Sequence, residues 1–431
     1  MAEKSRSDWS VKNTRSQQFN SQTVTIAFVK EAVFGEASKR ALLSYLMAVA
    51  SMKYPNQQAV TKKLMALFGA NYQVRVQSYG NLNVLLFSLT FVKSERLDPS
   101  LVHGMDLEKE ALAFLKEMIF DQRFDEKAGF DPAVLKAEKQ NLAQAILART
   151  DDKVTVAMDE ARQRLFKDKA AQESILGSLE EVNALTLDEL QQAYEEMVTT
   201  DWRIVDVQGD MSDTFLEKQL ATWPKKAVGQ DSNTKTLQPR AKRPAVLNRP
   251  FSVVFREDFQ QAIALAHFKL PNEGETLAAA MVLNAYFGAG PSSLLFREVR
   301  EKQSLAYHVA SRLHWDLGLV TVLAECSLGK GRLVLTLIDE QLESLKQGKI
   351  DQGAFDQAKQ LVLSGRKKMA DSPQESAMEE LFRGLTVDFP TASELAAAIS
   401  AVTIEEIVAL AAKLKSINRL VMEKGAAANG Q

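Results

Sequence analysis

An internal repeat constrains the fold of this chain more than any other feature. The segment NALTLDELQQAYEEM, residues 183–197, has a counterpart in SAVTIEEIVALAAKL, residues 400–414. In each segment a threonine is followed three residues later by a glutamate, the pattern of a capping box at a helix start. The two pairs are Thr186 with Glu189 and Thr403 with Glu406, offset by about 217 residues. The repeat predicts two similar domains in sequence.

A second match strengthens the repeat. AEKQNL around Lys139 resembles DQAKQL around Lys359, and both stretches lie on long helical patterns. A linker rich in Lys, Arg, Pro, Ser, Asn and Gln separates the halves at residues 225–250. We therefore expect an N-terminal domain at 1–224 and a homologous C-terminal domain at 251–431.

Each half shows the same order of predicted elements: a strand, two helices, two strands with alternating polarity, a long helix, further helices and a last strand. The predicted strands are 23–29, 72–78, 83–91 and 203–207 in the first half, and 252–255 with 262–268, 306–313, 319–326 and 419–422 in the second. The predicted helices include 39–50, 56–68 and 106–119, then 276–286, 292–302 and 331–347. This order is typical of an α+β sandwich, one sheet with helices on one face.

Composition excludes several classes of protein. The 53 Lys and Arg nearly cancel the 55 Asp and Glu, so a basic nucleic-acid-binding surface is not expected. No stretch approaches the roughly 18 apolar residues of a membrane span. The start, MAEKSRSDWS, lacks the apolar core of a signal peptide. The single cysteine, Cys326, excludes an internal disulfide and favours a reducing compartment, so we expect a cytoplasmic protein.

The histidines argue against a zinc enzyme of the usual kind. The chain has four: His103, His267, His308 and His314. Catalytic zinc normally needs two or three nitrogen or sulfur ligands close together, and no two of these histidines have the i, i+4 spacing of one helix face. No Ser/His/Asp or Cys/His constellation indicates a hydrolase of another class.

The segment GAGPSSLLFREVREKQSLAY, residues 288–307, carries the most information about function. Its glycines and proline end one helix, and Ser292 or Ser293 can cap the next. This segment resembles the insulinase/pitrilysin metallopeptidase family, whose second half shows S-x-L-F-x-x-[LV]-R-x-K-x-x-L-[AG]-Y. The matching residues are Ser293, Leu295, Phe296, Val299, Arg300, Lys302, Leu305, Ala306 and Tyr307.

The resemblance implies the fold and one pair of functional residues. The fold would be two homologous α+β sandwich domains of the LuxS/metallohydrolase type. In the family, the Arg and the Tyr seven residues later bind the substrate backbone and the tetrahedral intermediate, so these roles would fall to Arg300 and Tyr307. A guanidinium and a phenol are suitable donors to a carbonyl oxygen or an oxyanion. The alternative is that Arg300 is a solvated helix charge and Tyr307 a core aromatic residue.

The family's zinc motif, H-x-x-E-H, would lie on the first helix, before a loop like Lys53-Tyr54-Pro55. The motif positions here are Ser44, Met47 and Ala48, and the third ligand position falls near Gln144. No residue of that set is a histidine or a carboxylate, and residues 1–102 contain no histidine in any register. The first half is therefore interpreted as a degenerate peptidase domain without a metal.

The resemblance covers nearly the whole chain and points to an inactive branch of the family. Members of that branch imply a partner subunit that retains H-x-x-E-H and holds the zinc. The favoured hypothesis is a non-catalytic subunit of a heterodimeric zinc metallopeptidase that processes peptides, to which Arg300 and Tyr307 contribute substrate binding. The alternative is a structural, scaffold or peptide-binding protein of the same fold without a role in catalysis.

Overall fold

The computed structural model describes residues 9–102, 104–225, 239–271 and 276–425. Residues 226–238, the centre of the predicted linker at 225–250, lie outside the described residues. The chain forms two compact units, each built on one five-stranded sheet.

The first sheet has the strand order β1-β5-β2-β4-β3. Strand β1 runs parallel to β5, and the remaining neighbours are antiparallel. Its strands are β1 (Ser10–Arg15), β2 (Ser21–Glu31), β3 (Asn71–Tyr79), β4 (Leu82–Val92) and β5 (Trp202–Gly209). Four of them match the predicted strands, whereas β1 was not predicted.

The second sheet repeats this topology strand for strand, with the order β6-β10-β7-β9-β8 and one parallel pair, β6 with β10. Its strands are β6 (Ser252–Phe255), β7 (Ala262–Lys269), β8 (Ala306–His314), β9 (Leu319–Cys326) and β10 (Lys415–Glu423). The predicted α+β fold with an internal duplication is confirmed. The two sheets also explain β1, because it is the counterpart of β6.

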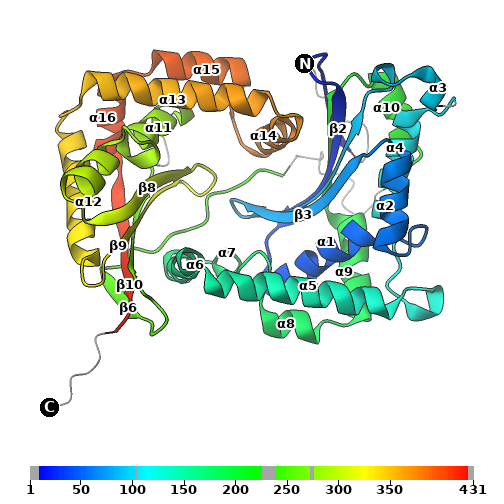
Figure 1. Ribbon diagram of the computed structural model, residues 1–431, viewed down its shortest axis with the longest axis horizontal. Coiled ribbons are helices and arrows are strands. Elements are labelled where there is room, and N and C mark those ends of the chain that lie inside the picture. Colours follow the sequence, from blue (N-terminus) through cyan, green and yellow to red (C-terminus); the bar gives the residue numbers. More distant parts are fainter. Residues whose placement is uncertain (1–8, 103, 226–238, 272–275, 426–431) are drawn as a thin grey trace, which may run out of the picture. The chain divides into compact units, whose positions relative to one another are not determined.

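Helices account for most of the remaining described chain, and Figure 1 shows them beside the two sheets. Those of the first half are α1 (Ala37–Val49), α2 (Gln57–Ala66), α3 (Pro99–Val102), α4 (Leu107–Phe120), α5 (Pro132–Asp151), α6 (Lys153–Leu165), α7 (Lys169–Gln172), α8 (Leu179–Ala184), α9 (Leu187–Thr200) and α10 (Asp213–Leu220), with short 3₁₀ turns η1 (Ser94–Arg96) and η2 (Glu126–Ala128). Those of the second are α11 (Leu277–Asn284), α12 (Gly331–Lys346), α13 (Gln352–Ala370), α14 (Pro373–Leu385), α15 (Ala392–Ala401) and α16 (Ile404–Lys413), with two π-helical segments, η3 (Ala285–Ala289) and η4 (Phe296–Lys302).

The repeat seen in the sequence has a matching set of interactions. Both predicted capping boxes are present, at the starts of α9 and α16. The ammonium group of Lys139 donates to the carbonyl oxygens of Asn183 and Leu185, at 3.0 and 2.6 Å. Its counterpart Lys359 donates to those of Ser400 and Val402, at 2.6 and 2.9 Å. Each lysine thus bonds carbonyls at the end of the helix before the capping box, where acceptors lack helical partners.

The compact units do not follow chain order. The first comprises Met1–Ala148, Glu173–Ala241 and Ala370–Val387, and the second comprises Arg149–Gln172, Lys242–Met369 and Asp388–Gln431. Each half of the sequence therefore gives helices to the other unit: α6 and the short α7 belong to the second unit, and α14 belongs to the first. The domain boundaries 1–224 and 251–431 drawn from the sequence stay a prediction. The order of the elements along the chain did not reveal that helices of one half pack in the unit of the other half.

Helix α14 covers the second face of the first sheet. Its Leu381 and Leu385 are buried with Ala27 and Val29 of β2 and Ile204 of β5. The opposite face carries the main core, to which α1, α4 and α9 contribute. Figure 1 shows α4 and α14 on opposite sides of this sheet. The predicted single layer of helices is thus completed by one helix on the other face.

Helix α6 does the same for the second sheet. Its Ala157 and Ala161 are buried against Ile263 and Leu265 of β7 and Leu420 of β10. The main core lies on the other face, where α11, α12, α13, α15 and α16 contribute. In Figure 1, α6 and α12 lie on opposite sides of this sheet. The exchange is reciprocal, since α6 and α14 begin 220 residues apart.

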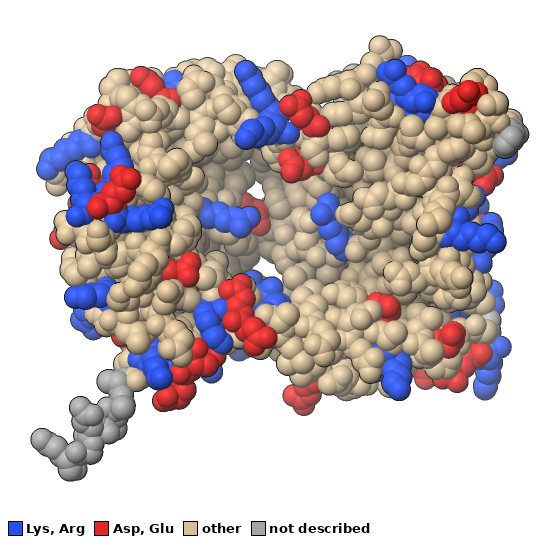
Figure 2. Space-filling model, in the orientation of Figure 1, with Lys and Arg blue, Asp and Glu red and all other residues tan. Residues whose placement is uncertain are grey.

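The surface carries both charges without a large field of either sign on the face shown in Figure 2. Within the described ranges, no single helix has the length and hydropathy needed to cross a membrane. The consecutive helices α15 and α16 meet that criterion only when counted together, across a bend of 98°.

A buried carboxyl group lies beneath the exchanged helix of the first unit. Asp206 on β5 is 1% exposed, and its Oδ1 accepts a hydrogen bond of 2.8 Å from Gln208 Nε2. Burial raises the pKa of Asp206 to about 7. Lys12 of β1 stands opposite Asp206 in the sheet register but pairs with Glu380 of α14. The cation that lies nearest to Asp206 in the register, Lys12, therefore forms its ion pair with the Glu380 carboxylate.

We predict that the Leu385→Ala variant loses about 2–5 kcal/mol of unfolding free energy, because it removes a fully buried side chain from the interface of α14 with the first sheet. Urea unfolding followed by circular dichroism measures the change. The matched control is Leu361→Ala on α13, where the leucine is 43% exposed, and its loss should stay below about 1 kcal/mol. Equal losses in the two variants would contradict the packing of α14 described above.

We predict that the Asp206→Asn variant removes a pH dependence of stability. The native protein holds the Asp206 proton up to about pH 7, whereas the unfolded chain releases it near pH 4, so wild-type stability falls as the pH rises through this interval. Over the whole interval, the loss of unfolding free energy corresponds to about 4 kcal/mol. The advantage of the variant over wild type should therefore be larger at pH 8 than at pH 5 in urea unfolding. Glu257→Gln, at an exposed carboxylate, is the control, and a variant difference independent of pH would contradict the assignment.

Candidate functional site

The positions expected for the zinc motif lie on α1, in the first unit, and two of them are buried. Met47 is fully buried in the main core, and its carbonyl oxygen accepts a hydrogen bond of 3.0 Å from the Tyr72 hydroxyl. Ser44 is 4% exposed and donates within the helix to the carbonyl oxygen of Ala41, at 2.7 Å. Ala48 is half-buried. A thioether in the core, an internally bonded hydroxyl and a methyl group do not fit a zinc ion.

The expected third ligand position, Gln144, is an exposed residue of α5. The acidic residue that α5 brings toward α1 is Glu138, which is buried and holds both carboxylate oxygens 3.1 Å from the amide nitrogen of Asn141. Burial and the nearby Glu138 raise the pKa of Tyr45 on α1. One carboxylate therefore approaches this helix, six residues before the position expected from the motif.

The rest of the described chain also lacks a set of metal ligands. Within the part of the chain that the structure describes, no three His, Cys, Asp or Glu side chains gather in a way that could hold a metal ion. His267 is 3% exposed, and its Nδ1 lies 3.2 Å from the Asn418 side-chain nitrogen. Burial lowers the pKa of His267 to about 3, so it is neutral at pH 7 and packs as a core residue.

The conspicuous segment at residues 288–307 forms an irregular helical connection in the second unit. Both helices that flank its glycine-rich turn are π-helical, η3 before the turn and η4 after it. The Phe296 N–H at the start of η4 donates to the Ser293 hydroxyl, at 3.4 Å. π-Helical turns are rare and are enriched at functional sites, because the wider turn changes the directions of its side chains.

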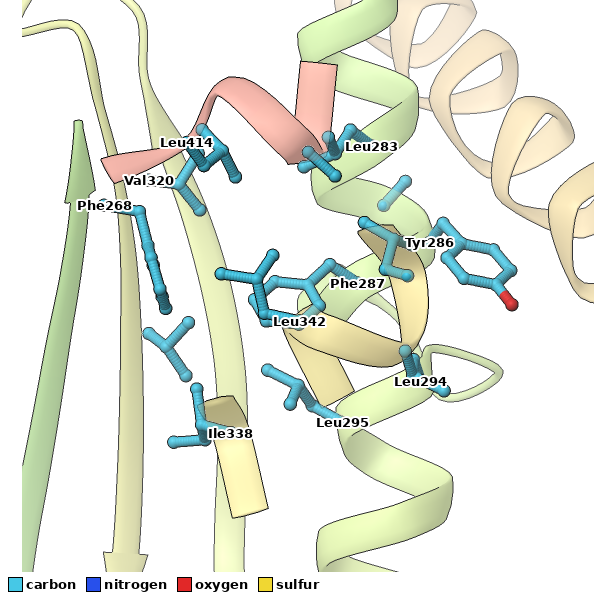
Figure 3. Close-up of a cluster of buried hydrophobic side chains, with 14 of the residues drawn as sticks. Phe268, Leu283, Tyr286, Phe287, Leu294, Leu295, Val320, Ile338, Leu342 and Leu414 are labelled. Carbon is cyan, nitrogen blue, oxygen red and sulfur yellow. The ribbon is translucent and has the colours of Figure 1, made fainter. Parts of the chain in front are cut away.

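The segment is anchored by apolar packing (Figure 3). Phe287 and Leu295 point toward Ile338 and Leu342 of α12, whereas Leu294 lies on the side nearer Tyr286, and all of these side chains are buried. The side of this connection that faces the core is therefore fixed, while the polar residues of η4 remain on its other side. Leu294, Leu295 and Val299 are all buried in this packing.

Arg300, in η4, is exposed, and its guanidinium carbon lies 4.7 Å from the centre of the Phe296 ring, one helical turn earlier. Stacking on an aromatic face restrains a guanidinium group while leaving its N–H donors free to bind other groups.

Tyr307 lies at an irregularity of the edge strand β8. The pairing with β9 shifts between Ala306 and His308, so Tyr307 is the extra residue of a β-bulge. Bulges re-aim side chains at strand ends, and Tyr307 is 60% exposed. Its hydroxyl lies 3.0 Å from the Ser327 hydroxyl, just after β9. The alternative of a core aromatic residue at this position is therefore wrong.

The two predicted groups of site residues fall in different units. Ser44, Met47, Ala48 and Gln144 belong to the first unit, and Arg300 and Tyr307 belong to the second. Their assignment as degenerate ligand positions and as substrate-binding residues stays a prediction. Phe296 belongs to the sequence motif, but the sequence analysis gave it no role. Ser327 was not predicted, because no sequence pattern links it to Tyr307, twenty positions earlier.

Comparison with known proteins gives a family profile and several relatives that this chain resembles. A family profile described as "Peptidase M16 inactive domain" matches residues 184–362. The chain is a homologue of the M16 peptidases. One relative of this M16 homologue is the "Probable inactive metalloprotease YmfF" of Bacillus subtilis, 22% identical over 356 residues that cover 81% of this chain and 80% of that protein.

Two further matches extend over most of this M16 homologue. The "Uncharacterized zinc protease YmxG" of Bacillus subtilis is 24% identical over 70% of this chain and 72% of its own length. The crystal structure of a conserved protein from Enterococcus faecalis V583 superposes with a TM-score of 0.84 at 25% identity, covering 98% of this chain and 97% of that one. The two-domain α+β fold is thus shared along the whole chain.

We predict that Met47→Glu severely destabilises the protein, because it restores the family's glutamate where the side chain is now fully buried without a partner. The loss should exceed about 3 kcal/mol in urea unfolding. Met65→Glu on α2 is the matched control, since Met65 is 70% exposed, and it should change stability by less than about 1 kcal/mol. A Met47→Glu protein as stable as the control would show that α1 still accommodates the peptidase residue.

Proposed function

We propose that this M16 homologue is the non-catalytic subunit of a heterodimeric zinc metallopeptidase that processes peptides. In this proposal a homologous partner with H-x-x-E-H holds the zinc and the general base. This chain contributes Arg300 and Tyr307 as substrate-binding groups and has no metal of its own. The assembly is proposed to act in the cytoplasm, as expected from the sequence.

The observation that carries the proposal is a contrast between the two units. At the zinc-motif positions Ser44 and Met47 the side chains are buried and engaged within the first unit. By contrast, Arg300 and Tyr307 are exposed on the second unit. Exposure of two strong donors is consistent with binding an external ligand, since a peptide carbonyl or oxyanion needs such donors.

The relatives support the idea of paired subunits. Bacillus subtilis has both a protein named as a probable inactive metalloprotease and one named as a zinc protease, and this chain is similar to each along most of its length. An organism that has both kinds of protein has the components of such a pair. Zinc chemistry would then be supplied by the partner, because the motif positions of this chain offer no ligand set.

The alternative is a structural or scaffold protein of the same fold. Two contacts favour it: Arg300 stacks on Phe296 and Tyr307 bonds to Ser327, so both side chains have partners within their own unit. In that case the two residues would stabilise the turn and the strand edge without contacting a substrate.

We predict that cleavage of an unstructured peptide library requires both subunits. The purified chain alone should neither cleave nor bind zinc, whereas a mixture with an H-x-x-E-H homologue from the same genome should cleave and contain one zinc per heterodimer. Mass spectrometry of the products and metal analysis measure the two quantities. Zinc and activity in this chain alone would contradict the proposal, and association without any gain in cleavage would favour the scaffold.

The double variant Arg300→Ala with Tyr307→Phe tests the role of the pair. It should lower the turnover of the mixture by about 10²–10³-fold, the usual effect of losing donors to an oxyanion. Arg312→Ala, at another exposed arginine of β8, is the control and should leave turnover nearly unchanged. If the double variant has the activity of wild type, Arg300 and Tyr307 do not bind the substrate.

A further inference from the structure

The surroundings of Tyr307 contain a second polar group that the family motif does not include. The Ser327 hydroxyl lies 3.0 Å from the Tyr307 hydroxyl, and either oxygen can donate. Both residues are exposed. A bulge residue at the end of an edge strand has few backbone restraints on its direction, so this bond is a principal restraint on the phenol.

Ser327 itself is held in place by its turn. The Lys330 N–H donates to the carbonyl oxygen of Ser327, at 3.1 Å, which closes a four-residue turn between β9 and α12. Gly329 adopts a φ of +76° in this turn, a conformation that other residues rarely take. The Gly329 N–H donates to the carboxylate of Glu423 at the end of β10, at 2.8 Å. The turn is thereby fastened to a strand of the second sheet.

We propose that Ser327 is a positioning residue for Tyr307. Its hydroxyl donates to the phenol oxygen and leaves the phenol proton free to point at a substrate carbonyl oxygen. The chain of contacts runs from Glu423 through the Gly329 turn to Ser327 and then to Tyr307, so the direction of the phenol is set by the sheet. This inference rests on the proposed function of Tyr307 as a substrate-binding group.

A hydroxyl bonded in this way acts on the developing oxyanion rather than on overall affinity. A donor that is already oriented loses little freedom when charge develops on the substrate oxygen, so its effect appears mainly in the transition state. Loss of Ser327 should therefore lower kcat and leave KM nearly unchanged. A threonine at this position keeps the hydroxyl and should restore the restraint.

The experiment compares Ser327→Ala, Ser327→Thr and Tyr307→Phe in the mixture with the zinc-bearing homologue. We expect Ser327→Ala to lower kcat about tenfold with KM within a factor of two, Ser327→Thr to recover most of the rate, and Tyr307→Phe to lower kcat further. The control Ser364→Ala, at an exposed serine of α13, should match wild type. Fluorine NMR of the full chain labelled with 3-fluorotyrosine, assigned with Tyr307→Phe, should show the Tyr307 resonance shifted and narrowed in Ser327→Ala only.

The outcomes separate the two proposals. Unchanged kcat in Tyr307→Phe, or no cleavage by the wild-type mixture, would overturn the proposed function and this inference with it. If Tyr307→Phe lowers kcat but Ser327→Ala has the wild-type kcat, only the proposed role of Ser327 is overturned. A slow Ser327→Ala that Ser327→Thr does not rescue, or whose urea midpoint falls as its rate falls, would show that Ser327 acts on folding and would overturn positioning.

Discussion

The architecture depends on the covering of both faces of each sheet. The central strand β2 is buried at every position from Gln22 to Val29, and β7 is buried from Ala262 to Phe268. Such strands need apolar layers on two sides, and each half keeps its main helices on one side. The exchanged helices α14 and α6 supply the second layer. Each repeat therefore completes the sheet of the other.

This arrangement separates the parts of the molecule that keep the fold from those that can interact with other molecules. Helix α1 is now part of the core, with Met47 fully buried and its carbonyl bonded to Tyr72. The segment at residues 285–307 of the second unit combines several irregular features: two π-helical turns, a bulge at Tyr307 and an exposed Arg300. Departures from regular geometry persist where the surrounding packing fixes them, and the cluster around Phe287 and Leu342 provides that packing here.

Most of the fold could be predicted from periodicity, while most of the site could not. The strands at 252–255 and 319–326 match the structure, because alternation and turn residues are local signals. The strand β1 was missed since its six residues, SVKNTR, are mostly polar and gain their order by pairing with β5. Arg300 and Tyr307 were found only through a family resemblance. The contact of Tyr307 with Ser327 joins β8 to the turn after β9 and has no signature in either segment.

The sequence by itself determined the duplication, the α+β class and the absence of zinc ligands at the motif positions, because these depend on residue identity and spacing within short stretches. Tertiary structure decided which helix covers which sheet and which side chains stay exposed. The apolar runs TVTIAFV and AIALAHF predicted strands, but the sequence predicted helices on one face of each sheet and did not reveal the helix that covers the other face. Burial is a property of the assembled layers, so Met47 became core and Tyr307 became surface only when the layers packed.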